Sequence, residues 1–141
     1  MGRDREGREP RAVSVHAINP AGIAAPVGLY SHGVLAPAGG HWLHVSGQVG
    51  MLPDGTLAAG FAEQAAVAWS NLLAVLQAAG MDASHLVKVF TFMTEAGDLA
   101  QLGAVRSRFL GAARPASTLL IVKALARPDW LIEVEAIACR S

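Results

Sequence analysis

Three features are scarce in this chain, and each scarcity narrows the class of protein. Cys139 is the single cysteine among 141 residues, which excludes an internal disulfide and favours a reducing, cytoplasmic compartment. Charged residues make up only 16%, with 11 basic and 11 acidic side chains. Because nucleic-acid binding draws on phosphate neutralisation, this balance predicts no nucleic-acid partner. No apolar run reaches the ~18 residues of a membrane-spanning helix, so no membrane partner is expected.

What the chain has in excess is apolar residues, which make up 52% of it. Seven of the 22 charged side chains fall within residues 3–11, so we expect residues 1–12 to form a charged, flexible tail without a secretory signal. Residues 13–141 are then one domain, and an unusually apolar one. Either its core is large, or it has a core and a buried subunit interface. The second interpretation is favoured, because a small domain has a limited interior.

The hydrophobic pattern predicts strands interrupted by two helices. Apolar residues recur at helical spacing over 61–79, before Gly80, and again over 98–110, before Gly111. Strands are expected over 12–18, 31–36, 41–48, 85–93, 117–125 and 130–138. Residues 31–36 and 41–48 would form a hairpin across "PAGG". This order predicts an α+β fold, a mixed sheet with both helices on one face. The strands are apolar on both sides, so the other sheet face needs a partner.

Candidate chemistry from the residues alone rests on two carboxylates. Glu133 and Glu135 share one face of a predicted strand, about 7 Å apart. They could hold a water as a general base, but the pattern by itself favours a solvated strand face.

The five histidines show no metal-ligand spacing, so no metal is expected. There is no phosphate-binding loop either, and no cofactor is predicted.

Several stretches, taken in order, resemble the Rid family of reactive intermediate deaminases, also called YjgF-like proteins. They are "APVGLYSHGV", "VSGQVG", "NLLAVLQAAGMD", "HLVKVFTFMT", "RPASTLLIV" and "LIEVEAIA", and they span about residues 18–138. The resemblance implies a chorismate-mutase-like fold, a homotrimer, and ligand sites in the clefts between subunits. It also implies hydrolysis of enamine or imine intermediates to a keto acid and ammonia. Some members of the family are described as endoribonucleases, which the neutral charge disfavours here.

The resemblance also assigns site residues. The family tyrosine corresponds to Tyr30, the backbone of its Ser-Gly-Gln turn to that around Gly47, and the glutamate that positions the hydrolytic water to Glu133. The family arginine that clamps the substrate carboxylate corresponds to Ser117, so the clamp is missing. An asparagine that deaminases often carry on a helix falls at Gly103.

Two nearby cations were considered as substitutes for the missing clamp. Arg114 should point to the face opposite Ser117 unless Pro115 breaks the strand, and Lys123 lies about 20 Å along the strand. We therefore predict weak or no activity on imines derived from amino acids with a free carboxylate, and hydroxyl contacts from Ser117 and Thr118. Two hypotheses stay open: a divergent imine hydrolase with altered substrate preference that uses Glu133, and a non-catalytic trimer that binds a small molecule in the cleft between subunits.

Overall fold

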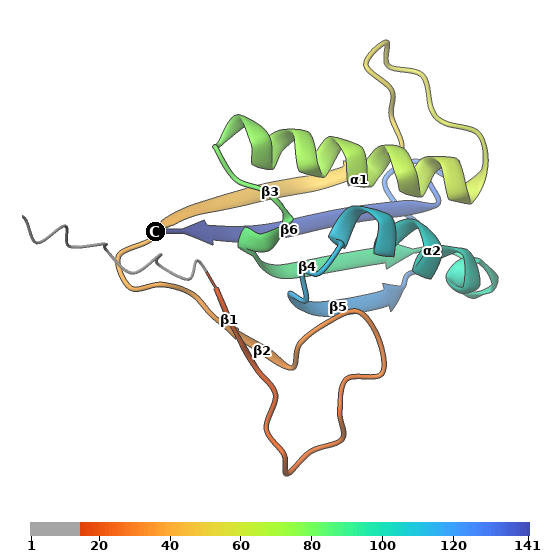
Figure 1. The fold of residues 1–141 in the computed structure, drawn as a ribbon. Helices are drawn as coiled ribbons and strands as arrows, with labels where there is room; N and C mark the ends of the chain where they lie inside the picture. The colour runs from red at the N-terminus through yellow and green to blue at the C-terminus, as the bar shows by residue number, and fades with distance from the viewer. Residues whose placement is uncertain (1–14) are drawn as a thin grey trace, which may run out of the picture.

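A four-stranded mixed sheet backed by two helices forms the body of the molecule (Figure 1). The structure, a computed structural model, describes residues 15–141. The sheet runs in the order β3 (His41–Val49), β6 (Ile132–Arg140), β4 (Leu86–Met93) and β5 (Ala116–Ile121). β4 and β5 pair in parallel, and the other neighbours are antiparallel. The helices are α1 (Gly60–Ala78) and α2 (Leu99–Leu110), with 3₁₀ turns η1 (Ala83–His85) and η2 (Ala96–Asp98).

Both helices lie on the same face of the sheet, as the sequence predicted (Figure 1). α1 packs over β3 and β6 with a fully buried stripe that includes Trp69, Leu72 and Leu76. α2 joins the core through Leu102, and its Phe109 ring stacks on Trp69 with 6.4 Å between centroids. Gly80 and Gly111, which follow the helices, have φ values of +69° and +56°, and this conformation ends each helix. The α+β prediction is therefore confirmed.

The predicted hairpin between residues 31–36 and 41–48 is wrong. β2 (Gly33–Leu35) pairs with β1 (His16–Ile18) in a separate two-stranded ribbon, and β3 pairs with β6. β3 and β6 have nine residues each, so their pairing satisfies far more backbone groups than a three-residue partner could. The predicted charged tail, residues 1–12, lies outside the described part of the chain. So do residues 12–14 of the first predicted strand.

The strand predicted over 117–125 is too long. β5 ends at Ile121, which pairs with Met93, the last residue of β4. The N–H of Val122 makes the last hydrogen bond to β4, to the carbonyl of Met93 at 2.8 Å, and the chain then leaves the sheet and runs as a loop to Ile132. The second helix also begins one residue later than predicted, after the turn η2.

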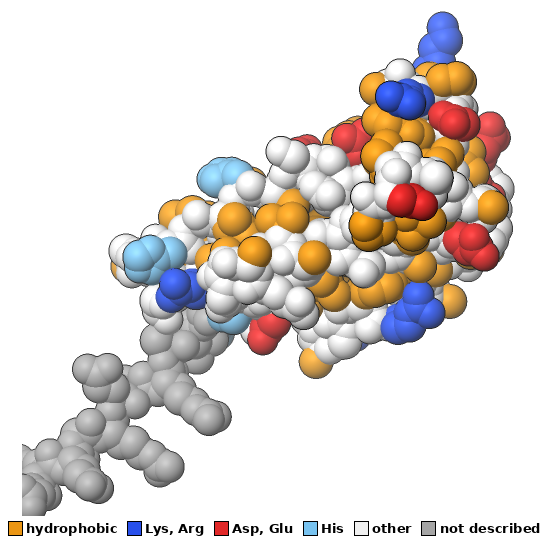
Figure 2. Space-filling view, turned by 90° about the horizontal axis from the view of Figure 1, so that it is seen from above, with side chains coloured by type: hydrophobic (Ala, Val, Ile, Leu, Met, Phe, Trp, Pro, Cys, Tyr) orange, Lys and Arg blue, Asp and Glu red, His pale blue; other side chains and the backbone are white. Residues whose placement is uncertain are grey.

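The sheet face turned away from the helices, called here the open face, is mixed in character. Along β6, Ile132, Val134 and Ala136 are buried toward the helices, and Glu133 and Glu135 alternate with them onto the open face. Phe90 and Phe92 of β4 lie opposite these glutamates in register. The prediction that both sheet faces are apolar is thus only partly right. Elsewhere on the surface, Figure 2 shows exposed hydrophobic side chains between sparse charges.

Candidate functional site

Gly47 and Glu133, which the sequence analysis assigned to one site, lie against each other. The register of β3 with β6 shifts between Val45 and Gln48, so Ser46 and Gly47 form a bulge. A Cβ atom built on Gly47 would overlap the carboxylate of Glu133. Glycine is therefore the residue that lets this carboxylate occupy its position over the bulge. Bulges often re-aim side chains next to functional sites.

A pocket of about 370 Å³ opens beside this contact on the open face. Glu133 and Glu135 both line it, so the two carboxylates do share one face, as predicted. The remaining wall is mostly apolar and consists of Gly47, Phe92, Val122, Ala124, Leu125 and Ala126. Sequence reasoning missed Phe92 and the loop 122–126. Strand alternation could have indicated Phe92, but the loop was assigned to a strand. The arrangement holds two carboxylates against a mostly apolar wall.

α1 fixes the segments on either side of this pocket through two buried or partly buried amides. The backbone N–H of Leu131 donates to Gln64 Oε1 at 2.9 Å, and Gln64 Nε2 donates to the carbonyl of Asp129 at 3.1 Å. Asn71 Nδ2 donates to the carbonyls of Val49 and Met51, at 3.3 and 3.0 Å. Gln64 thus holds the entrance to β6, and Asn71 holds the end of β3 beyond the bulge.

Tyr30 lies in a different place, at the outer edge of β5. The next residue, Ser31, forms a parallel bridge with Ala116. Its N–H donates to the carbonyl of Pro115 at 3.0 Å, and its hydroxyl donates to the carbonyl of Arg114 at 2.5 Å. This pairing brings the Tyr30 segment beside the start of β5, next to Ser117. The Tyr30 hydroxyl accepts from the N–H of Val27 at 3.3 Å.

Ser117 and Thr118 point to opposite faces of the sheet. Ser117 pairs with Val89, which is buried under the helices, and Thr118 pairs with Phe90 on the open face. The Thr118 hydroxyl accepts a hydrogen bond from Lys88 Nζ at 2.7 Å. The two hydroxyls therefore do not line one surface.

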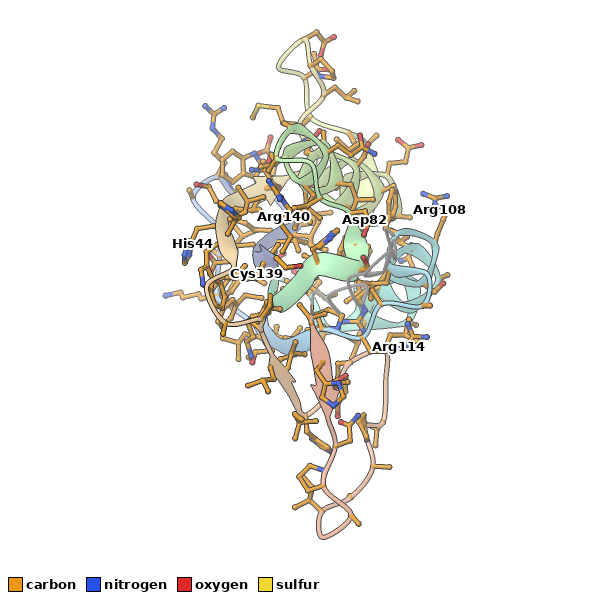
Figure 3. All side chains as sticks on the ribbon, turned by 60° about the vertical axis from the view of Figure 1, so that its left-hand side comes forward. His44, Asp82, Arg108, Arg114, Cys139 and Arg140 are labelled. Atoms are coloured by element: carbon orange, nitrogen blue, oxygen red, sulfur yellow. The ribbon has the colours of Figure 1, made fainter. Side chains whose placement is uncertain are left out.

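Arg114 caps the end of α2. Its Nη1 donates to the carbonyls of Gly111 and Ala113 at 2.8 and 2.7 Å, a favourable position for a cation at a helix C-terminus. Figure 3 shows Arg114 beside α2, on the other side of the molecule from His44. The structure thus gives Arg114 partners of its own beside the helix. Lys123, the other candidate, lies beyond the end of β5.

The candidate residues form two separate groups within one chain. Glu133 is in register with Phe92, and Phe92 with Leu120, so Glu133 and Ser117 are two strands and three residues apart. At ordinary strand spacings this places their Cα atoms roughly 14 Å apart, with side chains on opposite faces. We call the two groups the open-face group (Gly47, Glu133) and the edge group (Tyr30, Ser117).

Within residues 15–141, no three His, Cys, Asp or Glu side chains lie close enough together to hold a metal ion. Neither helix there is long and apolar enough to cross a bilayer.

The fold and this pair of residue groups define a helix-backed mixed sheet with a carboxylate pocket on its open face. The family described as Endoribonuclease L-PSP matches residues 22–140, and the chain belongs to this family, that of the Rid and YjgF-like proteins. This confirms the resemblance found in the sequence.

Named relatives and a solved structure agree with this assignment. The chain is 34% identical over 134 residues to protein DfrA of Myxococcus xanthus, covering 91% of this chain and 98% of that protein. It is 33% identical over 123 residues to the 2-iminobutanoate/2-iminopropanoate deaminase of Bos taurus, covering 86% and 87%. The crystal structure of YyfB, a Rid-family protein of unknown function from Yersinia pestis, matches with a TM-score of 0.81 at 32% identity, covering 89% and 98%.

Proposed function

We propose that this protein hydrolyses imines or enamines to a carbonyl compound and ammonia, with a substrate preference that differs from that of its relatives. The observation that carries the proposal is the carboxylate of Glu133, which lines an apolar pocket and touches the bulge at Gly47. Distant relatives named 2-iminobutanoate/2-iminopropanoate deaminases support the reaction class. The proposal requires no metal and no cofactor.

In the proposed reaction Glu133 is the group that handles protons. Its carboxylate accepts a proton from a water while the water oxygen forms a bond to the imine carbon. The proton held by Glu133 passes to the imine nitrogen, which gives a carbinolamine and restores the carboxylate. Glu133 then takes the hydroxyl proton of the carbinolamine and gives it to the nitrogen as the C–N bond breaks, so the products are the carbonyl compound and ammonia. Water is consumed once, and Glu133 ends in its starting protonation state. The apolar wall would exclude competing water and strengthen this carboxylate's interactions.

The site is proposed to be complete only in an oligomer. Glu133 and Ser117 lie roughly 14 Å apart on opposite faces at ordinary strand spacings, so one small substrate cannot contact both within one chain. A second copy that packs on the open face would bring its own edge group to the pocket. A homotrimer, with the ligand held between subunits, satisfies this requirement by closed symmetry. It would also cover Phe90 and Phe92.

A second candidate function is a trimer that binds a small molecule without turning it over. The observation that favours it is Ser117, a neutral residue at the position where the family resemblance expects a substrate-clamping arginine. Both candidates use the same pocket, and they differ only in whether Glu133 moves protons.

Glu133→Gln tests the catalytic role, because it removes the proton acceptor and keeps the volume. General-base catalysis contributes about 10²–10⁴-fold, so we expect ammonia release from the best imine substrate to fall at least about tenfold. Glu135→Gln is the matched control on the same strand face, and we expect a smaller loss. Turnover is measured by ammonia release across imines with and without a carboxylate. Equal, small effects of the two changes would reject hydrolysis through Glu133 and favour the binding protein.

A further inference from the structure

Arg106 of α2 is partly buried and has no counter-charge among residues 15–141. Its Nε is shielded from solvent and, within residues 15–141, has no hydrogen-bond partner. The ion pair formed among those residues joins His85 to Asp82, so no described carboxylate lies within 4.0 Å of Arg106. Burial lowers the pKa of its guanidinium, because the charge has lost water without gaining an anion. A cation left in this state is poised to bind a negatively charged group.

The direction of Arg106 follows from the packing of α2. Phe109 faces α1, where it stacks on Trp69. At 100° per residue Arg106 lies on the flank of α2 that continues through Leu110, away from α1. α1 covers β3 and β6, and α2 lies beside it toward β4 and β5 (Figure 1). The flank that carries Arg106 is thus turned toward the edge of the sheet at β5.

Arg106 is also level with the start of β5. α2 connects the end of β4 to the start of β5, and the two strands are parallel, so α2 runs back antiparallel to β5. Arg106 lies one turn, about 6 Å, before the end of α2. Ser117 lies one residue, about 3 Å, after the start of β5, on the sheet face that the helices cover. From these spacings we expect Arg106 and Ser117 at similar heights along the sheet.

The surface of α2 is unfilled one turn before Arg106. Gly103, one turn earlier on the same flank, has no side chain, and a Cβ built there would meet no atom within 4 Å. On the other side, Ser31 ties the Tyr30 segment to the start of β5. A small ligand at this edge would thus meet a cation, the Ser117 hydroxyl and an unfilled space in one place.

We infer that Arg106 binds the carboxylate of the ligand, with the Ser117 hydroxyl beside it, and thereby supplies from α2 the cation that β5 lacks. The carboxylate is the anion that fits best, because Nε–H and an Nη–H of one guanidinium match its two oxygens in a fork. This inference rests on the proposed function for the location of the site, but not for any chemical step. It revises the expectation of weak activity on imines with a free carboxylate. That expectation rested on Arg114 and Lys123 as the candidate cations, and Arg106 is a third.

Other arginines of the same region have different partners and provide controls. Arg108, two residues further on α2, lies over the ring of Phe109 at 4.9 Å, and Arg114 donates to the carbonyls at the end of the helix. Arg108→Met removes the same charge from the same helix without touching the proposed site.

The test is a binding measurement on the assembled full-length protein. The probes are 2-oxobutanoate, a stable carboxylate of the size of a small keto-acid product, and its neutral methyl ester, each titrated by calorimetry. We expect wild type to prefer the acid, and Arg106→Met to weaken acid binding by about 10- to 100-fold with little change for the ester. Arg108→Met should leave both affinities unchanged. Equal acid affinity in wild type and Arg106→Met, or no acid binding by wild type, would overturn the inference.

A rescue variant distinguishes the loss of a carboxylate contact from a general folding defect in Arg106→Met. Ser117→Arg in the Arg106→Met background returns a cation to the facing strand, and we expect it to recover at least about tenfold of the lost acid affinity. A well-folded double variant that stays as weak as Arg106→Met would count against a shared site. Glu133→Gln should still bind 2-oxobutanoate. If the protein hydrolyses no imine but Arg106→Met still weakens 2-oxobutanoate binding and Ser117→Arg restores it, the proposed hydrolase function is rejected. The inference that Arg106 binds the carboxylate then still stands.

Discussion

The open-face group and the edge group differ in how tightly the fold constrains them. At the open-face group, Gly47 touches the carboxylate of Glu133 so closely that a Cβ atom has no room, and Gln64 ties down the loop that leads to it. The residues of α2 that we place beside the edge group are less constrained. Gly103 borders open space, and Arg106 lacks a counter-charge within the described residues. The difference suggests that the proton-handling half of the site tolerates little change, whereas the ligand-binding half can exchange one cation for another.

The largest effect is expected at Gly47. Gly47→Ala adds a methyl group where the Glu133 carboxylate lies, so the bulge or the carboxylate must shift by an ångström or more. Displacements of this size can cost about 100-fold in rate, and we expect ammonia release to fall by that much. Gly97→Ala, in the turn η2, is the control, because its methyl group would meet no atom within 4 Å. Full turnover by Gly47→Ala would contradict the conclusion that the open-face group is the more tightly constrained of the two.

The next prediction concerns stability, and its expected effects are smaller. It compares Gln64 and Ser31, whose side chains hold the segments next to the open-face group and the edge group. Gln64→Ala leaves the N–H of Leu131 and the carbonyl of Asp129 without partners, and we expect the free energy of unfolding to fall by about 2–4 kcal/mol. Ser31→Ala removes one hydrogen bond to the carbonyl of Arg114 and should cost only about 1 kcal/mol. Urea unfolding of both variants measures the difference. Equal losses would mean that the open-face group is not the more firmly held.

The third prediction asks whether the two groups come from different copies. Glu133→Gln and Arg106→Met are each expected to be nearly inactive on an imino acid. When the two variants assemble together at equal amounts, about a quarter of the sites in random trimers should combine an intact Glu133 with an intact Arg106. Activity should then recover to about a quarter of wild type.

Two measurements accompany the mixing experiment. Sedimentation equilibrium of wild type is expected to give a trimer, and a stable monomer at micromolar concentration would contradict the shared site. A mixture no more active than the average of its two components would place both groups in the same chain.

Sequence patterns predicted those features that depend on neighbouring residues. The two helices, the alternation that separates Glu133 and Glu135 from Val134, and the glycines that end the helices all follow from local periodicity and backbone preference. The hairpin at "PAGG" failed because two compatible strands do not reveal which partner each one will choose. The extra length given to β5 failed because a strand ends where its neighbour ends.

The sequence by itself determined the fold class and the family, since these reside in periodicity and in an ordered set of motifs. Only the tertiary structure decided that Arg114 caps α2, that Glu133 and Ser117 lie far apart within one chain, and that Arg106 is partly buried without a counter-charge among residues 15–141. The physical reason is that burial and charge pairing depend on elements distant in the chain. Arg106 and Ser117, for example, are eleven residues apart in the sequence and lie on different elements, α2 and β5.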